Sequence, residues 1–144
     1  MSIQTMKRVC PVFLMVSLVL LFSCKKYVQQ QEKNAALAII TNGLWYVSGY
    51  QQNDSNITAS FSGYLFKFDA NSTVTGTKNN VSTAGIWSVD IASQSITTNF
   101  PTAGDTLRKL NETWKITDSY TDSVSARSTD TIDHTSNILQ LRKQ

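Results

Sequence analysis

The sequence has few of the residues on which disulfide frameworks, metal sites and catalytic centres depend. Its 144 residues include two cysteines and one histidine. It contains no Gly-x-Ser-x-Gly motif, and its carboxylates form no recognisable acid and base pair. Serine and threonine are abundant, but a nucleophile needs a positioned base held by a third group. We therefore predict no catalytic residues, no cofactor and no enzymatic activity.

The single histidine, His134, lies in the segment Asp130-Thr131-Ile132-Asp133-His134. Two carboxylates and an imidazole can bind a metal, and the imidazole alone can act as a general base. The segment is polar, however, and no second histidine or free cysteine accompanies it. We interpret it as a solvated loop and expect no metal site.

The sequence also lacks a long run of one charge. Lys and Arg number 13 against 10 Asp and Glu, a formal net charge of +3. Two of the cations, Lys7 and Arg8, fall in a segment that we expect to be removed, which leaves 11 against 10. Nucleic-acid binding depends on clustered cations that neutralise phosphates. We therefore expect no nucleic-acid partner.

The first 23 residues have the organisation of a secretory signal. Lys7 and Arg8 precede an uncharged apolar run from Val9 to Phe22, which is shorter than the roughly 18 to 20 residues of a spanning helix. The run ends in Leu21-Phe22-Ser23-Cys24, which has the form of a bacterial lipobox: Leu21 fits an apolar protease subsite, and Ser23 is small enough for cleavage next to it. Cys24 supplies the thiol for a diacylglycerol thioether.

These features predict the organisation and the location of the mature protein. Removal of residues 1–23 from 144 leaves 121, enough for one small domain. Cys10 is lost with the signal and Cys24 carries lipid, so no thiol remains for a disulfide. Several acyl chains anchor a protein stably where one does so marginally. Because residue 25 is Lys rather than Asp, the common sorting rule for Gram-negative lipoproteins favours the outer membrane.

Residues 24–42 connect the lipid to the domain. Lys25 to Lys33 is polar and rich in Gln, and we interpret it as a flexible tether. The Ala-rich stretch Ala35 to Ile40 precedes Asn42-Gly43, which fits a short helix with a left-handed cap. A first strand is the alternative, because Ile39 and Ile40 are β-branched.

From residue 43 to 144 the chain consists of short alternating runs separated by turn residues, which is typical of an antiparallel β-barrel or sandwich. Phe66 and Phe68 alternate with Lys67 and Asp69, and Asn79-Asn80 marks a turn. The predicted strands are 44–51, 60–69, 73–78, 83–91, 95–100, 111–118, 120–128 and 137–143, with a brief strand or turn at 106–110. Short connections favour pairing in sequence, an all-β up-and-down barrel of about eight strands that closes on itself.

Several motifs in residues 43–143 resemble the lipocalin superfamily, in particular the small lipocalin-like lipoproteins of Gram-negative bacteria. They are Gly43-Leu44-Trp45 at the first strand, the aromatic strand and turn of 61–73, Gly85-Ile86-Trp87, and the later strand with Trp114. The resemblance implies a barrel that binds a small apolar molecule, and we expect the protein to be a monomer. It also implies that a late basic residue, here Arg142, packs over the first-strand tryptophan.

The large aromatic side chains allow two interpretations. They either line a pocket for an apolar ligand or fill the interior of a small barrel. The residues concerned are Trp45, Tyr64, Phe66, Phe68, Trp87 and Trp114. With a pocket, the protein would carry or sense a small apolar molecule. With a solid barrel, it would be an accessory or inhibitory module that binds another envelope protein.

Overall fold

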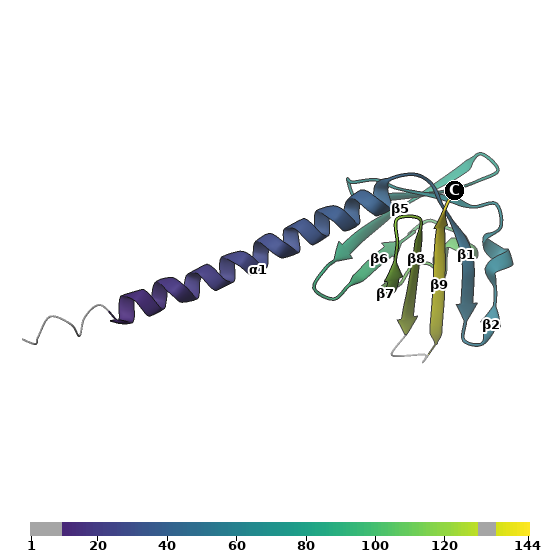
Figure 1. The fold of residues 1–144 in the computed structure, drawn as a ribbon. Helices are drawn as coiled ribbons and strands as arrows, with labels where there is room; N and C mark the ends of the chain where they lie inside the picture. The colour runs from purple at the N-terminus through teal and green to yellow at the C-terminus, as the bar shows by residue number, and fades with distance from the viewer. Residues whose placement is uncertain (1–9, 130–134) are drawn as a thin grey trace, which may run out of the picture.

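The fold consists of one long helix followed by a closed β-barrel (Figure 1). The computed structural model describes residues 10–129 and 135–144; side chains are described from residue 26 onward, Thr129 excepted. Within these residues the elements are α1 (Cys10–Thr41), β1 (Trp45–Gln52), β2 (Ser55–Asn56), the 3-10 helix η1 (Thr58–Phe61), β3 (Leu65–Phe68), β4 (Thr73–Lys78), β5 (Val81–Asp90), β6 (Ser95–Asn99), α2 (Asp105–Arg108), β7 (Thr113–Ser119), β8 (Ser123–Thr129) and β9 (Ser136–Lys143).

Sequential antiparallel pairing builds the barrel, and β1 closes it against β9. The sheet order is β2-β1-β3-β4-β5-β6-β7-β8-β9, with the additional pairing of β1 and β9. That closing pair runs from Trp45 opposite Lys143 to Gln52 opposite Asn137. Because β2 is only a two-residue extension of the β1 hairpin, the closed barrel has eight strands. The predicted up-and-down barrel is confirmed.

Two local signals in the sequence determine where elements end. Asn79 and Asn80 both have positive φ, 51° and 64°, and connect Lys78 directly to Val81 across a tight hairpin. Asparagine tolerates this left-handed conformation better than most residues. Gly43 follows α1 with a φ of 96°, where a side chain would be strained. The predicted Asn-Asn turn and the glycine stop after the helix are therefore both present.

Helix α1 extends over residues for which the sequence predicted a flexible tether. Its exposed part includes 26–34, where the Gln30 side chain donates to the Asn34 Oδ1 atom (3.1 Å) and Gln31 donates to the Tyr27 hydroxyl (2.9 Å). Gln, Glu and Lys are good helix formers, and pairs four residues apart face each other on a helix. The connection is therefore a helical spacer, with a rise of about 1.5 Å per residue.

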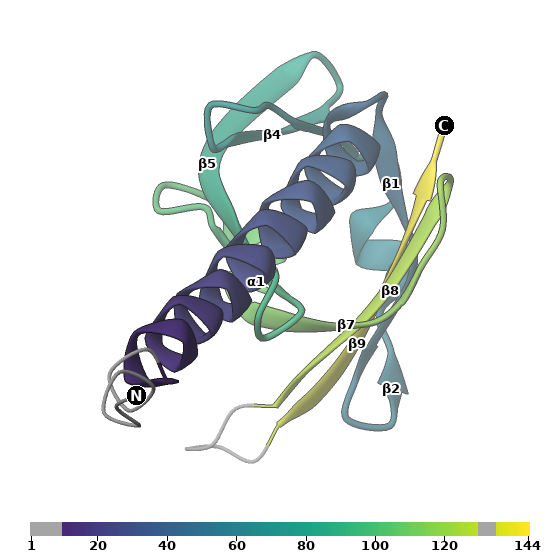
Figure 2. The same ribbon diagram turned by 60° about the vertical axis from the view of Figure 1, so that its left-hand side comes forward.

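The two ends of the barrel differ. The turns after β3, β5 and β7, the C-terminus and the end of α1 meet at one end, here called the helix end (Figures 1 and 2). The opposite end receives η1 and α2, which bury Phe61 and Leu107 in the core. The sequence predicted a brief strand or turn at 106–110, and the chain forms the helical turn α2 there instead.

Tyr50 connects the elements of that opposite end. Its ring is 1% exposed, stacks on Phe61 with centroids 5.0 Å apart, and meets the edge of Trp114 at 5.8 Å. The phenol donates to the Lys109 carbonyl at 2.7 Å. Burial, and secondarily the charge of Glu112, raises the pKa of Tyr50 from 10.0 to about 12.

We expect this shift to make stability fall at alkaline pH. Between pH 10 and 12 the unfolded chain has lost the Tyr50 proton and the folded chain retains it, so the unfolded state binds fewer protons and the free energy of unfolding decreases as pH rises. The loss is about 2 kcal/mol. Urea titrations at pH 9 to 12 measure it. Tyr50→Phe lacks the titrating phenol, so its free energy of unfolding should fall less steeply with pH. An equally steep fall in both proteins would contradict the assignment of this pH dependence to Tyr50.

Candidate binding site at the helix end of the barrel

The first-strand tryptophan anchors the helix to the barrel. Trp45 is fully buried, and its Nε1 atom donates to the Ile40 carbonyl in the last turn of α1 at 2.8 Å. The ammonium of Lys143 lies 5.2 Å from the centre of the Trp45 ring, within the range of a cation–π contact. The basic residue over this ring is thus Lys143, and the expectation of Arg142 was wrong.

Strand register explains why Lys143, and not Arg142, packs over Trp45. Lys143 is the direct partner of Trp45 across the β1–β9 pair, and directly opposite residues share a face of the sheet. Arg142 is opposite Tyr46, whose side chain is 38% exposed, so it belongs to the outer surface. Because side chains alternate along a strand, a shift of one residue moves a side chain to the other face.

A second cation fixes the end of α1. The Lys67 ammonium, which projects from β3, donates to the Thr41 carbonyl at 2.7 Å. The last carbonyls of a helix have no partner within the helix, and they carry partial negative charge that favours a cation. Together with the Trp45 bond, this contact holds the last turn of α1 against the barrel.

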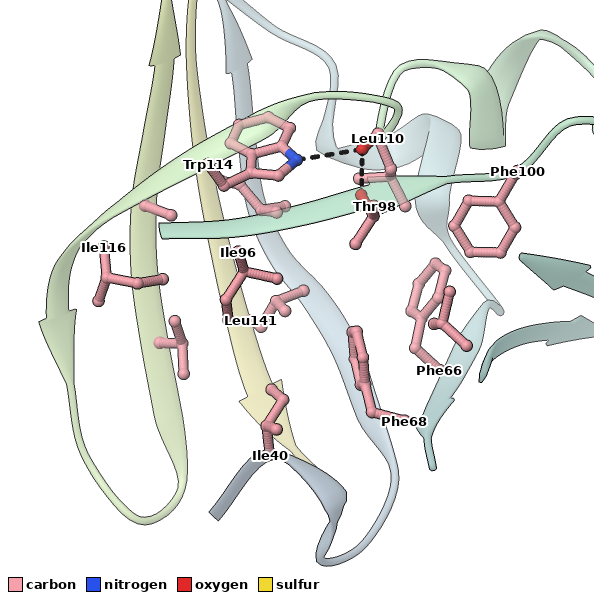
Figure 3. A pocket seen from close by; sticks show the side chains of 14 residues that line it. Ile40, Phe66, Phe68, Ile96, Thr98, Phe100, Leu110, Trp114, Ile116 and Leu141 are labelled. Carbon is pink, nitrogen blue, oxygen red and sulfur yellow. Dashed lines mark hydrogen bonds between the residues drawn. The ribbon is translucent and has the colours of Figure 1, made fainter. Parts of the chain in front are cut away.

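The interior of the barrel is filled, apart from a small apolar cavity of about 40 Å³ (Figure 3). Such a volume holds very few water molecules, whereas ligand sites measure about 300 to 1,000 Å³. Figure 3 shows Ile40 from α1 at one side of it and Trp114 at the other. The indole of Trp114 donates to the Leu110 carbonyl at 3.1 Å, and the Thr98 hydroxyl donates to the same oxygen.

The six predicted aromatic residues occupy three different environments. Phe66, Phe68 and Trp114 line the small cavity. Trp45 and Trp87 are buried in the core outside it; Trp87 packs edge-on against Phe68 at 5.4 Å and donates to the Asp69 carbonyl at 2.9 Å. Tyr64 lies nearer the surface, under the ammonium of Lys78 at 5.0 Å. The aromatic residues therefore fill the barrel and do not enclose a ligand-sized space.

A larger hollow lies between α1 and the strands at the helix end. This space, here called the mouth groove, measures about 430 Å³. Its walls are the last three turns of α1, the β5–β6 turn and the β7–β8 hairpin, and they include Glu32, Ala36, Ile39, Ile40, Val89, Asp90, Ile91, Gln94, Ser95, Ile96, Ile116, Thr117, Asp118, Ser119 and Val124. Ile40, Ile96, Ile116 and Val124 also line the small cavity, so the groove leads to the apolar interior.

The sequence did not predict this site, because one of its walls is the segment interpreted as tether and short helix. The spacing of Ala36, Ile39 and Ile40 places them on one side of a helix, and this was the one available signal of a buried face. The strand residues of the groove are more than 45 positions away in the sequence. No local pattern connects such distant segments.

Asp90 holds a fixed position at the rim of the mouth groove. Its Oδ1 atom accepts from the amide of Ala92 at 2.9 Å and from the amide of Ser93 at 3.5 Å, so it stabilises the β5–β6 turn. A hydrogen bond from the Ser93 side chain, and then the amides of Ser93 and Ala92, hold the pKa of Asp90 below its ordinary value. The carboxylate is therefore ionised at neutral pH.

Some of the predicted sites lie outside what the structure describes. Leu21, Phe22, Ser23 and Cys24 are in α1, but their side chains are not described. His134 and its neighbouring carboxylates lie outside the described residues, as do Lys7 and Arg8. Within the described residues, no three His, Cys, Asp or Glu side chains come together as a metal site would require. No helix of the described residues combines the length and the apolar character that crossing a membrane requires.

Comparison with known proteins defines the fold and little more. No family model matches the chain, and no curated protein matches it. A solved structure that is similar is the crystal structure of a DUF4847 family protein from Bacteroides vulgatus, with a TM-score of 0.54 and 16% sequence identity. The alignment covers 76% of this chain and 99% of that chain. The similarity supports the barrel architecture.

Proposed function

We propose that this protein is a lipocalin-like lipoprotein of the cell envelope that binds a small apolar molecule in the mouth groove and does not catalyse a reaction. Lipid on Cys24 attaches it to the membrane, with the outer membrane of a Gram-negative bacterium as the expected location. Helix α1 is the spacer between lipid and barrel. The lipobox and the preceding apolar run support the anchoring part of the proposal.

The observation that carries the binding part is the mouth groove itself. At about 430 Å³ it falls within the range of small-molecule sites, whereas the interior cavity of about 40 Å³ does not. Its deep side is formed by Ile40, Ile96 and Ile116. An apolar molecule bound there removes this surface from water, which stabilises the complex by about 25 cal/mol per Å² before the entropic cost of binding is subtracted.

The second candidate function is a solid accessory or inhibitory module that binds another envelope protein. The filled interior favours it, because a barrel without a cavity is a rigid platform for its loops. The two candidates differ in one property: the groove of a ligand carrier takes up small apolar molecules, and an accessory module does not require this. Fold alone does not distinguish them.

Replacement of Cys24 with Ala tests the anchor. In a bacterium fed labelled fatty acid, we expect the natural protein and Cys10→Ala to become labelled and to sediment with membranes. The Cys24→Ala protein is expected to carry no label and to remain as an uncleaved or soluble form. Label on the Cys24→Ala variant would show that the anchoring proposal is wrong.

A tryptophan at residue 36 tests the groove. The side chain of Ala36 lines it, so Ala36→Trp should fill it and weaken binding of the neutral dye N-phenyl-1-naphthylamine by about tenfold or more, a change of about 1.4 kcal/mol. Ala38→Trp is the matched control. Ala38 is exposed, and because it lies two positions after Ala36 on the helix, its side chain points in a different direction. Fluorescence titration measures both. Equal affinities for the two variants would contradict binding in the groove.

A further inference from the structure

We propose that the mouth groove selects amphiphiles with a cationic head group, whose apolar chain lies between α1 and the barrel while the cation faces the rim. This inference rests on the proposed function and specifies its ligand class. It combines two properties of the same hollow, an apolar deep side and a rim of one charge sign. Neither property alone defines the ligand.

The rim carries three carboxylates from three separate elements. Glu32 belongs to α1, Asp90 to the end of β5, and Asp118 to the end of β7. All three side chains are exposed, and the residues that line the groove include no Lys, Arg or His. Lys26 and Lys33 line an adjoining hollow that shares Asp90 with the mouth groove. The charged residues that line the mouth groove itself are therefore all acidic.

The deep side of the groove is suited to a hydrocarbon chain. Ile39 and Ile40 of α1 face Ile96 and Ile116 of the barrel across it. The last three of these residues also border the interior cavity, which extends the apolar surface inward. A chain can therefore lie against isoleucine side chains along its length, while its polar end remains at the three carboxylates.

Charge discriminates between the possible amphiphiles. A fatty acid bound in this orientation would place its carboxylate beside Glu32, Asp90 and Asp118 in a site without a lysine or arginine, and like charges at short distance are unfavourable. An ammonium group in the same position is attracted electrostatically by each of the three carboxylates. Asp90 in particular keeps its charge and position, because the amides of Ala92 and Ser93 hold it.

Three ligands with the same chain and different head groups test this inference: octyltrimethylammonium, octanol and octanoate. A chain that begins at Lys26 contains every core residue and paired strand that the structure describes, as well as the whole groove. We expect calorimetry at low salt to give about tenfold tighter binding for the cation than for octanoate, with octanol between them. The difference should shrink at 0.5 M salt, where charges are screened within about 4 Å.

The variant Asp90→Asn/Asp118→Asn locates the effect. Asparagine at residue 90 retains an oxygen for the turn amides, so the fold is preserved. We expect the preference for the cation over octanoate to fall to about twofold. Asp54→Asn, which changes an exposed carboxylate at the opposite end of the barrel, should alter neither this preference nor the affinity for octanol.

The outcomes separate the inference from the function on which it rests. If octanol binds but octanoate binds as tightly as the cation, the head-group inference is wrong and groove binding stands. If the Asp54→Asn control loses the preference as much as the double variant, the inference is also wrong. If none of the three ligands binds, both the inference and the proposed function fail.

Discussion

Replacing Trp45 with Ala is expected to lower the free energy of unfolding by about 3 to 5 kcal/mol, the range observed for truncation of a buried large aromatic side chain. The indole is fully buried, and three parts of the chain depend on it. It packs in the barrel core, its Nε1 atom holds the Ile40 carbonyl of α1, and its ring lies under the ammonium of Lys143. The substitution leaves a cavity and an unpaired helix carbonyl together.

Urea unfolding followed by circular dichroism measures this effect. The matched control is Tyr46→Ala, which truncates the next residue of β1, an aromatic side chain that is 38% exposed on the outer face. We expect the control to cost about 1 kcal/mol or less. Similar losses in the two variants would contradict the assignment of Trp45 to the centre of the core.

Gly85→Ala is expected to have the second largest effect, a loss of about 1 to 3 kcal/mol from overpacking. A Cβ atom at this position would lie 2.6 Å from the Asn99 carbonyl oxygen and 2.8 Å from the ring of Phe100. The oxygen belongs to the backbone of β6, and Asn99 pairs with Ile86, so the methyl group can be accommodated only if the strands separate. Trp87, two residues further on, is buried on the same face.

Gly104→Ala is the control for this substitution. A Cβ there meets nothing within 4 Å, and the φ of −69° suits any residue. We expect a change within about 0.5 kcal/mol of the natural protein. Comparison of the two thermal midpoints therefore isolates the steric effect of Gly85 from the general effect of replacing a glycine. A Gly85→Ala protein as stable as the control would contradict the packing of β5 against β6.

The strands and their inward faces could be predicted because alternation is a local signal. Phe66 and Phe68 of β3, and Leu139 and Leu141 of β9, are buried as their two-residue period indicates. The turn at Asn79-Asn80 could also be predicted from local sequence, since few residues other than Gly, Asn and Asp adopt two successive positive φ angles. Closure of the barrel followed from short connections, which make neighbouring strands pair.

What the sequence did not predict depends on contacts between distant segments. The choice between Arg142 and Lys143 required the register of β9 against β1, which is set by the whole sheet. The alternation predicted for 120–128 failed at its start, because Tyr120 lies before β8 and is 64% exposed. The mouth groove exists because the Trp45 and Lys67 contacts fix the end of α1 over the barrel, and neither contact is visible in the sequence of α1 itself.

The central claim, that the groove beside α1 is the binding site and the barrel interior is filled, is tested most directly by mapping where octanol binds. In amide spectra of a ¹⁵N-labelled chain that begins at Lys26, we predict that the largest shift changes occur at groove residues such as Ala36, Ile91 and Thr117. Residues of the opposite end, such as Tyr50 and Leu107, should stay unchanged. Largest changes at Tyr50 and Leu107, with none at the groove, would contradict the account.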